Sequence, residues 1–187
     1  MIISDSTPTK INRNQILNNI DSSKENVIFK KFPGHTAKEI AYYVPKPLSD
    51  SKPNQVVIIA GTNSLAREIY DKGVVDEYII VDEIMEIARA APNHGVQKVH
   101  ESSILPRRGY KYRGVVEKVN NLLCMACIAE EFSFMDQVDL TLAHIDSDGI
   151  HPNYYGSIIL KHNILTVFDT FRPEFMDFQE DYDSALC

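Results

Sequence analysis

Ser6, Asp148 and His151 are the residues whose types and spacing suit nucleophilic chemistry. A serine hydroxyl is a poor nucleophile at neutral pH, so it needs a base within hydrogen-bond reach and a group that orients this base. The His151 imidazole can accept the hydroxyl proton, and Asp148, three residues earlier, can hold the ring in the required tautomer. These side chains predict acyl transfer through a serine nucleophile.

The same chemistry requires N–H donors for the oxyanion that forms on the attacked carbonyl group. Gly34 has no side chain, so its backbone N–H can approach a carbonyl closely. Asn63 carries a neutral amide donor in its side chain. Together with the backbone N–H of Ser6, which we expect at a strand-to-helix turn, these groups predict an oxyanion hole.

Short apolar runs alternate with longer amphipathic stretches, a pattern typical of βαβ units around a parallel sheet. The predicted strands are Met1–Ile3, Val27–Phe32, Gln55–Ala60, Val96–Ile104 and Phe132–Asp136. The predicted helices are Thr9–Ile20, Thr36–Val44, Ala66–Ala91, Gly114–Glu131 and Asn153–Phe171. Pro45 and Pro47 are expected to end the second helix, and Gly73 to break the third. Because ligands of such sheets bind outside the carboxyl ends of the strands, the loops that follow the strands should form the site.

Four motifs carry the candidate residues in chain order: Ser4-Asp5-Ser6-Thr7, Pro33-Gly34-His35-Thr36, Gly61-Thr62-Asn63 and Asp148-Gly149-Ile150-His151-Pro152-Asn153. With these four motifs in this order, the sequence resembles the SGNH hydrolases, the GDSL-type esterase and lipase superfamily. The resemblance covers Met1–Leu165. The resemblance implies an α/β fold, a flavodoxin-like three-layer α/β/α sandwich with a five-stranded parallel sheet of order 2-1-3-4-5.

The resemblance also implies roles for the site residues: Ser6 as nucleophile, His151 as base, Asp148 as its orienting acid, and an oxyanion hole from Ser6, Gly34 and Asn63. Two positions depart from the pattern of the superfamily. Ser4 stands where a glycine is usual, and Ser64 stands where an aspartate is usual. We expect these changes to alter hydrogen bonding in the loops more than the chemistry.

Chain length and net charge limit the number of domains and the kinds of partner that we expect. The 187 residues fit one domain, predicted over residues 1–172, followed by an acidic and mobile tail over residues 173–187. The first strand is so short that we expect the chain to be part of a longer polypeptide. The net charge of −7 repels nucleic acid and anionic lipid except at local sites. The sequence has neither a signal peptide nor an apolar run near the roughly 20 residues of a membrane span, which predicts a soluble chain.

The sequence predicts neither a metal nor another cofactor. Asp146-Ser147-Asp148-Gly149 resembles the start of a calcium loop, but its glycine comes too early and the acidic twelfth position is missing. Cys124 and Cys127 have the spacing of a metal or redox pair, yet they lie in an apolar helical pattern. A buried helix face explains this pair better.

The segment Arg107–Arg113 is the one basic and aromatic cluster of an acidic chain, and it follows the fourth predicted strand. It has three interpretations: a solvated loop, recognition of an anionic substrate group by Arg107 and Arg108, or RNA binding through stacking and phosphate contacts. The third interpretation belongs to a rival hypothesis, a catalytically silent SGNH-like module that binds RNA or a protein. The retained triad residue types favour an esterase instead, and the short connections between motifs predict an open site for a small acyl ester, such as an acetyl group on a carbohydrate.

Overall fold

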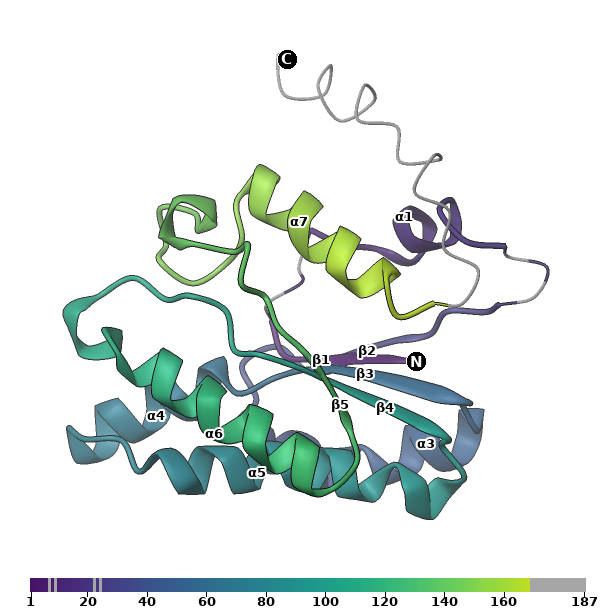
Figure 1. Cartoon of the computed structure of the whole chain (residues 1–187), viewed down its shortest axis with the longest axis horizontal. Coiled ribbons are helices and arrows are strands. Elements are labelled where there is room, and N and C mark those ends of the chain that lie inside the picture. The colour runs from purple at the N-terminus through teal and green to yellow at the C-terminus, as the bar shows by residue number, and fades with distance from the viewer. Residues whose placement is uncertain (7, 9, 22, 24, 169–187) are drawn as a thin grey trace.

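The computed structural model describes residues 1–6, 8, 10–21, 23 and 25–168 (Figure 1). Its strands are β1 (Ile2–Ser4), β2 (Phe29–Lys31), β3 (Gln55–Ile59), β4 (Lys98–Ser102) and β5 (Ser133–Met135). They pair in parallel in the order β2-β1-β3-β4-β5, which confirms the predicted sheet. The predicted tail, residues 173–187, and the end of the last predicted helix lie outside the described residues.

The strand register brings the loops after β1, β2 and β3 to the same edge of the sheet. Ser4, the last residue of β1, pairs with Lys31 at the end of β2 and with Ile59 at the end of β3. The three strands therefore end level with one another. The segments that continue from them carry Ser6, Gly34 and Asn63.

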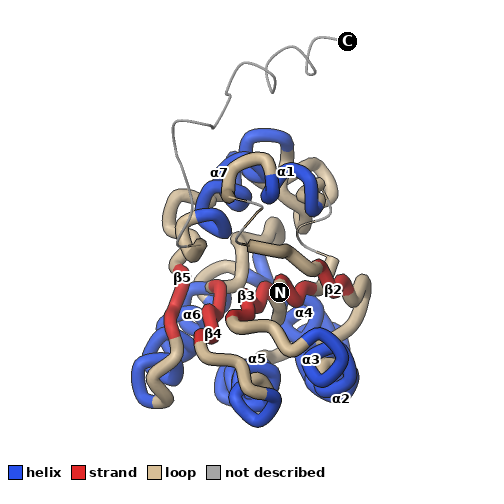
Figure 2. Tube along the Cα trace, turned by 90° about the vertical axis from the view of Figure 1, so that its right-hand side faces the viewer, coloured by secondary structure: helices blue, strands red, loops and turns tan. Residues whose placement is uncertain are grey.

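Helices cover both faces of the sheet, in three layers (Figures 1 and 2). One face carries α2 (Ala37–Tyr43), α3 (Pro45–Ser51), α4 (Thr62–Lys72), α5 (Glu77–Ala90) and α6 (Val115–Ala129), and the other carries α1 (Arg13–Leu17) and α7 (Tyr154–Leu165). Short 3-10 turns lie at Pro92–His94, Tyr110–Tyr112 and Leu142–His144. None of the helices in the described ranges is both long and apolar enough to span a bilayer.

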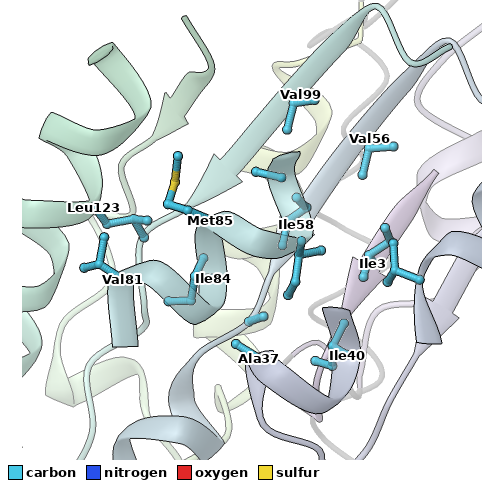
Figure 3. Packing of buried hydrophobic residues seen from close by; sticks show 14 of the residues in the cluster. Ile3, Ala37, Ile40, Val56, Ile58, Val81, Ile84, Met85, Val99 and Leu123 are labelled. Atoms are coloured by element: carbon cyan, nitrogen blue, oxygen red, sulfur yellow. The ribbon is translucent and has the colours of Figure 1, made fainter. Parts of the chain in front are cut away.

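Alternate residues of the central strands enter two cores, one on each face of the sheet, because successive strand side chains point to opposite faces. Ile3 and Ile58 pack with Leu123 and the other side chains beneath α2 to α6 (Figure 3). Ile2 and Val57 pack on the opposite face with α1 and α7. Each fully buried aliphatic side chain contributes about 1.5–3 kcal/mol, so both layers are held firmly against the sheet that positions the loops.

Three helix predictions need correction or refinement. The helix predicted over Thr9–Ile20 is only Arg13–Leu17, because the neighbouring asparagines favour caps and turns: Asn12 caps its start and Asn18 its end. Gly73, with φ +75°, ends α4 and separates it from α5, as predicted. Pro45 follows the end of α2, but it also begins α3, because a proline in the first turn of a helix loses no hydrogen bond.

Candidate active site

The Asp148 and His151 side chains form a short hydrogen bond, with 2.7 Å between Asp148 Oδ2 and His151 Nδ1. The second carboxylate oxygen, Oδ1, accepts from the backbone N–H groups of His151 and Ile150 at 3.0 and 2.8 Å. These bonds, with the His151 backbone N–H first, hold the pKa of the Asp148 carboxyl far below its usual range. The ionised carboxylate accepts from Nδ1 of His151, so the tautomer that it favours for a neutral imidazole carries the proton on Nδ1 and a lone pair on Nε2.

Nε2 of His151 is buried and has no hydrogen-bond partner in the described part of the chain. Ser6, the predicted nucleophile, is half-buried in the loop after β1. Its hydroxyl makes no hydrogen bond with Nε2 in this structure, so contact between the two remains a prediction. Catalytic hydrogen bonds are often long in unliganded enzymes and shorten in the substrate complex.

The loop that holds His151 is stabilised by hydrogen bonds within the loop and by hydrogen bonds from Arg108. Ile145 and Pro152 pair as an antiparallel bridge, and the Asp146 N–H donates to the His151 carbonyl at 2.8 Å. Arg108, in the loop after β4, donates its backbone N–H to the Gly149 carbonyl at 2.9 Å. Its Nη2 atom donates to two further carbonyl oxygens of this region, those of Leu142 at 3.1 Å and Ile145 at 2.9 Å.

The segment after Ser6 is tied to both of its neighbours in space. Lys31, at the end of β2, donates from Nζ to the Pro8 and Ile11 carbonyls at 3.2 and 2.9 Å. Lys10 forms an ion pair with Asp146 Oδ2 at 3.1 Å. This ion pair joins the segment that follows Ser6 to the loop that carries His151.

Gly34 and Asn63 are brought together across the β2 and β3 loops. Gly34 has a φ of +78°, which favours glycine, and a Cβ there would meet nothing within 4 Å. Asn63 Nδ2 donates to the carbonyl of the next residue, His35, at 3.0 Å. Among the described residues, the backbone N–H groups of Gly34 and Ser6 donate no hydrogen bond. Both N–H groups are therefore available to donate a hydrogen bond to an oxyanion.

Sequence reasoning missed the structural roles of Ser64 and of the two arginines. Ser64 Oγ accepts from the backbone N–H of Ala37 at 2.8 Å, which fastens the start of α4 to the start of α2. Arg107 Nη1 donates to the Thr62 carbonyl and hydroxyl at 3.0 and 3.2 Å, and its guanidinium lies 4.6 Å from the centre of the Tyr112 ring. Substrate binding by Arg107 and Arg108 remains a prediction. Their positions after β4 gave no signal of these contacts within the chain.

A cavity of about 560 Å³ lies beside these loops, between the segment after β4, the first turns of α6 and the segment after β5. Its lining is part apolar and part polar and includes Ile104, Arg107, Tyr112, Phe134, Gln137 and Leu142. The volume falls in the usual range for small-molecule sites. Arg107 joins this cavity to Thr62, the residue before Asn63. No cluster of three or more His, Cys, Asp or Glu side chains suited to a metal ion occurs in the described ranges.

Solved structures share this fold. A GDSL-like lipase from Bacteroides thetaiotaomicron is 19% identical over 89% of this chain and 85% of its own, with a TM-score of 0.69. A carbohydrate esterase family 3 protein from Talaromyces cellulolyticus is 18% identical over 89% and 94%, with a TM-score of 0.70. A catalytic mutant of an acetylxylan esterase from Geobacillus stearothermophilus is 16% identical over 92% and 95%, with a TM-score of 0.67.

The resemblance to the SGNH hydrolases is thus confirmed at the level of the fold: the chain has the flavodoxin-like α/β architecture of GDSL-type enzymes. No family model matches the sequence, and a search of curated proteins finds no match.

Proposed function

We propose that the protein is a serine ester hydrolase that transfers a small acyl group first to Ser6 and then to water. The observation that carries this proposal is the 2.7 Å Asp148–His151 hydrogen bond, which leaves Nε2 of an oriented imidazole without a partner in the described part of the chain. The fold supports the proposal, because the strand register brings the segments that carry Ser6, Gly34 and Asn63 to one edge of the sheet, where ligands of such sheets bind.

In the proposed reaction, Nε2 of His151 takes the proton of Ser6 Oγ while the oxygen attacks the ester carbonyl. The oxyanion accepts hydrogen bonds from the N–H groups of Ser6 and Gly34 and from Asn63 Nδ2. One N–H of Asn63 Nδ2 already donates to the His35 carbonyl, so we assign its second N–H to the oxyanion. Asp148 stabilises the imidazolium, which then protonates the leaving alcohol, and water repeats the sequence on the acyl-enzyme.

The substrate class is proposed as a small acyl ester, most simply an acetyl ester of a carbohydrate. Two of the structurally similar proteins are a carbohydrate esterase and an acetylxylan esterase, which supports this choice. The cavity beside Arg107 and Phe134 has the volume of a small-molecule site. An RNA- or protein-binding module remains the rival hypothesis. Arg107 and Arg108 favour it less, since each donates hydrogen bonds to groups of its own chain.

Hydrolysis of p-nitrophenyl acetate tests the proposal. We expect Ser6→Ala and His151→Ala each to lower kcat by about 10³-fold or more, and the double variant to lose little further, because members of one catalytic unit are not additive. Labelling with a fluorophosphonate, followed by peptide mapping, should modify Ser6. Turnover that survives Ser6→Ala would reject the nucleophile. Salt-sensitive RNA retention in a filter-binding titration, without any esterase activity, would support the rival module.

A further inference from the structure

Four ring side chains form a continuous cluster on the outer side of β2 and α2: Phe32, His35, Tyr42 and Tyr43. We call this set the aromatic platform. The ring centres of His35 and Tyr43 are 5.6 Å apart, and those of Phe32 and His35 are 6.1 Å apart. Phe32 and Tyr43 lie nearly parallel, with an angle of 14° and 6.4 Å between centres, and Tyr42 meets Tyr43 at 5.1 Å. Such centre distances are those of favourable aromatic pairs.

The aromatic platform is attached directly to the proposed oxyanion donors. His35 follows Gly34 in the chain, and its carbonyl accepts the hydrogen bond from Asn63 Nδ2 at 3.0 Å. Its ring is held by a hydrogen bond from Nδ1 to the Pro33 carbonyl at 3.1 Å. A substrate carbonyl bound at the Gly34 N–H would therefore lie next to His35, the member of the platform that follows Gly34 in the chain.

The support beneath the aromatic platform is rigid. Thr36 and Glu39 form a capping box at the start of α2, and Glu39 also pairs with Arg67 of α4 at 3.1 Å. Phe32 packs against the main core of that face. A capped helix with a salt bridge to its neighbour keeps the tyrosines of α2 fixed relative to Gly34 and Asn63.

The outer part of the aromatic platform is open to solvent. Tyr42 is 80% exposed and Tyr43 is 49% exposed, whereas Phe32 and His35 are half-buried. The two tyrosines thus add little apolar burial to the fold. Their rings present π-faces or edges to the solution at the end of α2, and Tyr43 connects them to His35, the residue after Gly34.

We propose that the aromatic platform binds the sugar ring of a neutral carbohydrate ester whose acyl group is attacked by Ser6. This inference rests on the proposed function and names its leaving-group site. The C–H groups of a pyranose carry partial positive charge, so they are attracted to the negative face of an aromatic ring. Tyrosine also offers a hydroxyl to the sugar hydroxyls.

The charges around the aromatic platform favour a neutral saccharide over a nucleic acid. The nearby Lys31 ammonium is already bonded to the Pro8 and Ile11 carbonyls, and the Arg67 guanidinium pairs with Glu39. The chain as a whole carries −7, which repels a polyanion. Lys38, four residues before Tyr42 on α2, is an exposed cation, but a phosphate backbone is tracked by a positively charged groove rather than by one lysine, so stacking here suits a sugar better.

Steady-state kinetics on two substrates test the aromatic platform. For an acetylated xylo-oligosaccharide, we expect Tyr43→Ala and Tyr42→Ala each to raise KM by about threefold to tenfold, the range of one aromatic contact. For ethyl acetate, whose leaving group has neither a sugar nor an aromatic ring, kcat/KM should stay within about twofold. Tyr70→Ala is the matched control, since Tyr70 is 89% exposed and lies on α4 outside the platform. Equal effects on both substrates, or no effect on either, would overturn the proposal.

A binding experiment separates this inference from the proposed chemistry. The chain has nine tyrosines and no tryptophan, so its intrinsic fluorescence reports on tyrosine. Titration of xylotetraose, which has no ester, into wild type and Ser6→Ala should change this fluorescence, and Tyr42→Ala should weaken the binding. If the wild type fails to hydrolyse any ester but binds xylotetraose through the platform, the proposed function alone is wrong. Lack of xylotetraose binding, or tighter binding of an oligouridylate, would reject the sugar site.

Discussion

The carboxylate of Asp148 does two tasks at once, because one oxygen orients His151 while the other ties down the turn that carries it. The hydrogen bonds that lower its pKa, with the His151 backbone N–H as the largest contribution, keep it charged in all but strong acid. A carboxyl whose pKa is lowered in the folded state loses its contribution only as the pH falls through that lowered pKa. We therefore expect Asp148 to leave no titration step in the pH profile of activity near neutrality.

Asp148→Asn should lower kcat for p-nitrophenyl acetate by about 10³–10⁴-fold, because an amide can donate to Nδ1 and so stabilise the wrong imidazole tautomer. The turn itself should persist, since the amide oxygen can still accept the two backbone N–H groups. Asp139→Asn, at an exposed aspartate, is the control and should keep full activity. Retention of more than a tenth of the wild-type kcat by Asp148→Asn would contradict the role given to Asp148.

Residue types and a contact between near neighbours in the chain were predictable from the sequence, whereas contacts between distant residues were not. The Asp148–His151 hydrogen bond could be foreseen, since the two residues lie three apart in a loop with a glycine. Arg108 could not be assigned its carbonyl partners, because Leu142 and Ile145 are distant in the chain and no local pattern points to them. Ser64 likewise contacts Ala37 across 27 residues of chain, so no local pattern could indicate this hydrogen bond.

At the scale of elements, the loop after β4 supports the loop that carries His151. Arg108 makes its three hydrogen bonds to carbonyls of residues 142–149, so it fixes the height and tilt of that loop above the sheet. Charged donors form the stronger class of hydrogen bond, and their loss leaves the carbonyls without partners. Arg108 is therefore a positioning residue in addition to any contact that it makes with substrate.

Arg108→Ala should lower kcat for p-nitrophenyl acetate by about tenfold to a hundredfold, the range expected when a catalytic group is displaced by about an ångström. KM should change little for this uncharged substrate. Lys111→Ala, at an exposed cation of the same segment, should behave as wild type. A rise in KM at constant kcat would instead assign Arg108 to substrate binding alone.

Element boundaries show why local patterns were insufficient. Short apolar runs located the strands of the sheet, most clearly β3, which is almost wholly apolar because a central strand is covered on both faces. The helix at Pro45 escaped because the same proline that ends one helix is well suited to begin another. Gly73, with its positive φ, was visible as a break because glycine is favoured there.

At the scale of the whole molecule, the core holds a carboxyl group that the proposed chemistry does not use. Glu101 lies on β4 and is entirely buried, and the Ser102 backbone N–H offsets only a small part of the cost of burying its carboxyl group. Burial raises its pKa well above the ordinary value of 4.5. The same region holds the Cys127 thiol, whose pKa is raised to about 12 by burial and, to a lesser degree, by Glu101.

The raised pKa of Glu101 couples the stability of the whole fold to pH. The folded chain keeps a proton that the unfolded chain releases above its ordinary pKa near 4.5, so stability is fully present below that pH and falls as the pH rises through the folded pKa. Glu101→Gln removes this linkage, because an amide of the same shape has no proton to lose. We expect the variant to be more stable than wild type at pH 7.5, by about 1.4 kcal/mol for each pH unit over which only the folded wild type keeps the proton.

Urea unfolding of both proteins at pH 4.5 and pH 7.5 measures this difference. The gap in free energy of unfolding between Glu101→Gln and wild type should be near zero at the lower pH and appear at the higher one. Glu117→Gln, at an exposed glutamate of α6, controls for the change in net charge and should show no such gap. Since the control shares the lost charge but lacks the burial, a gap of equal size in both variants would trace the effect to net charge, and a destabilised Glu101→Gln at pH 7.5 would mean that the ionised carboxylate is favoured in the core.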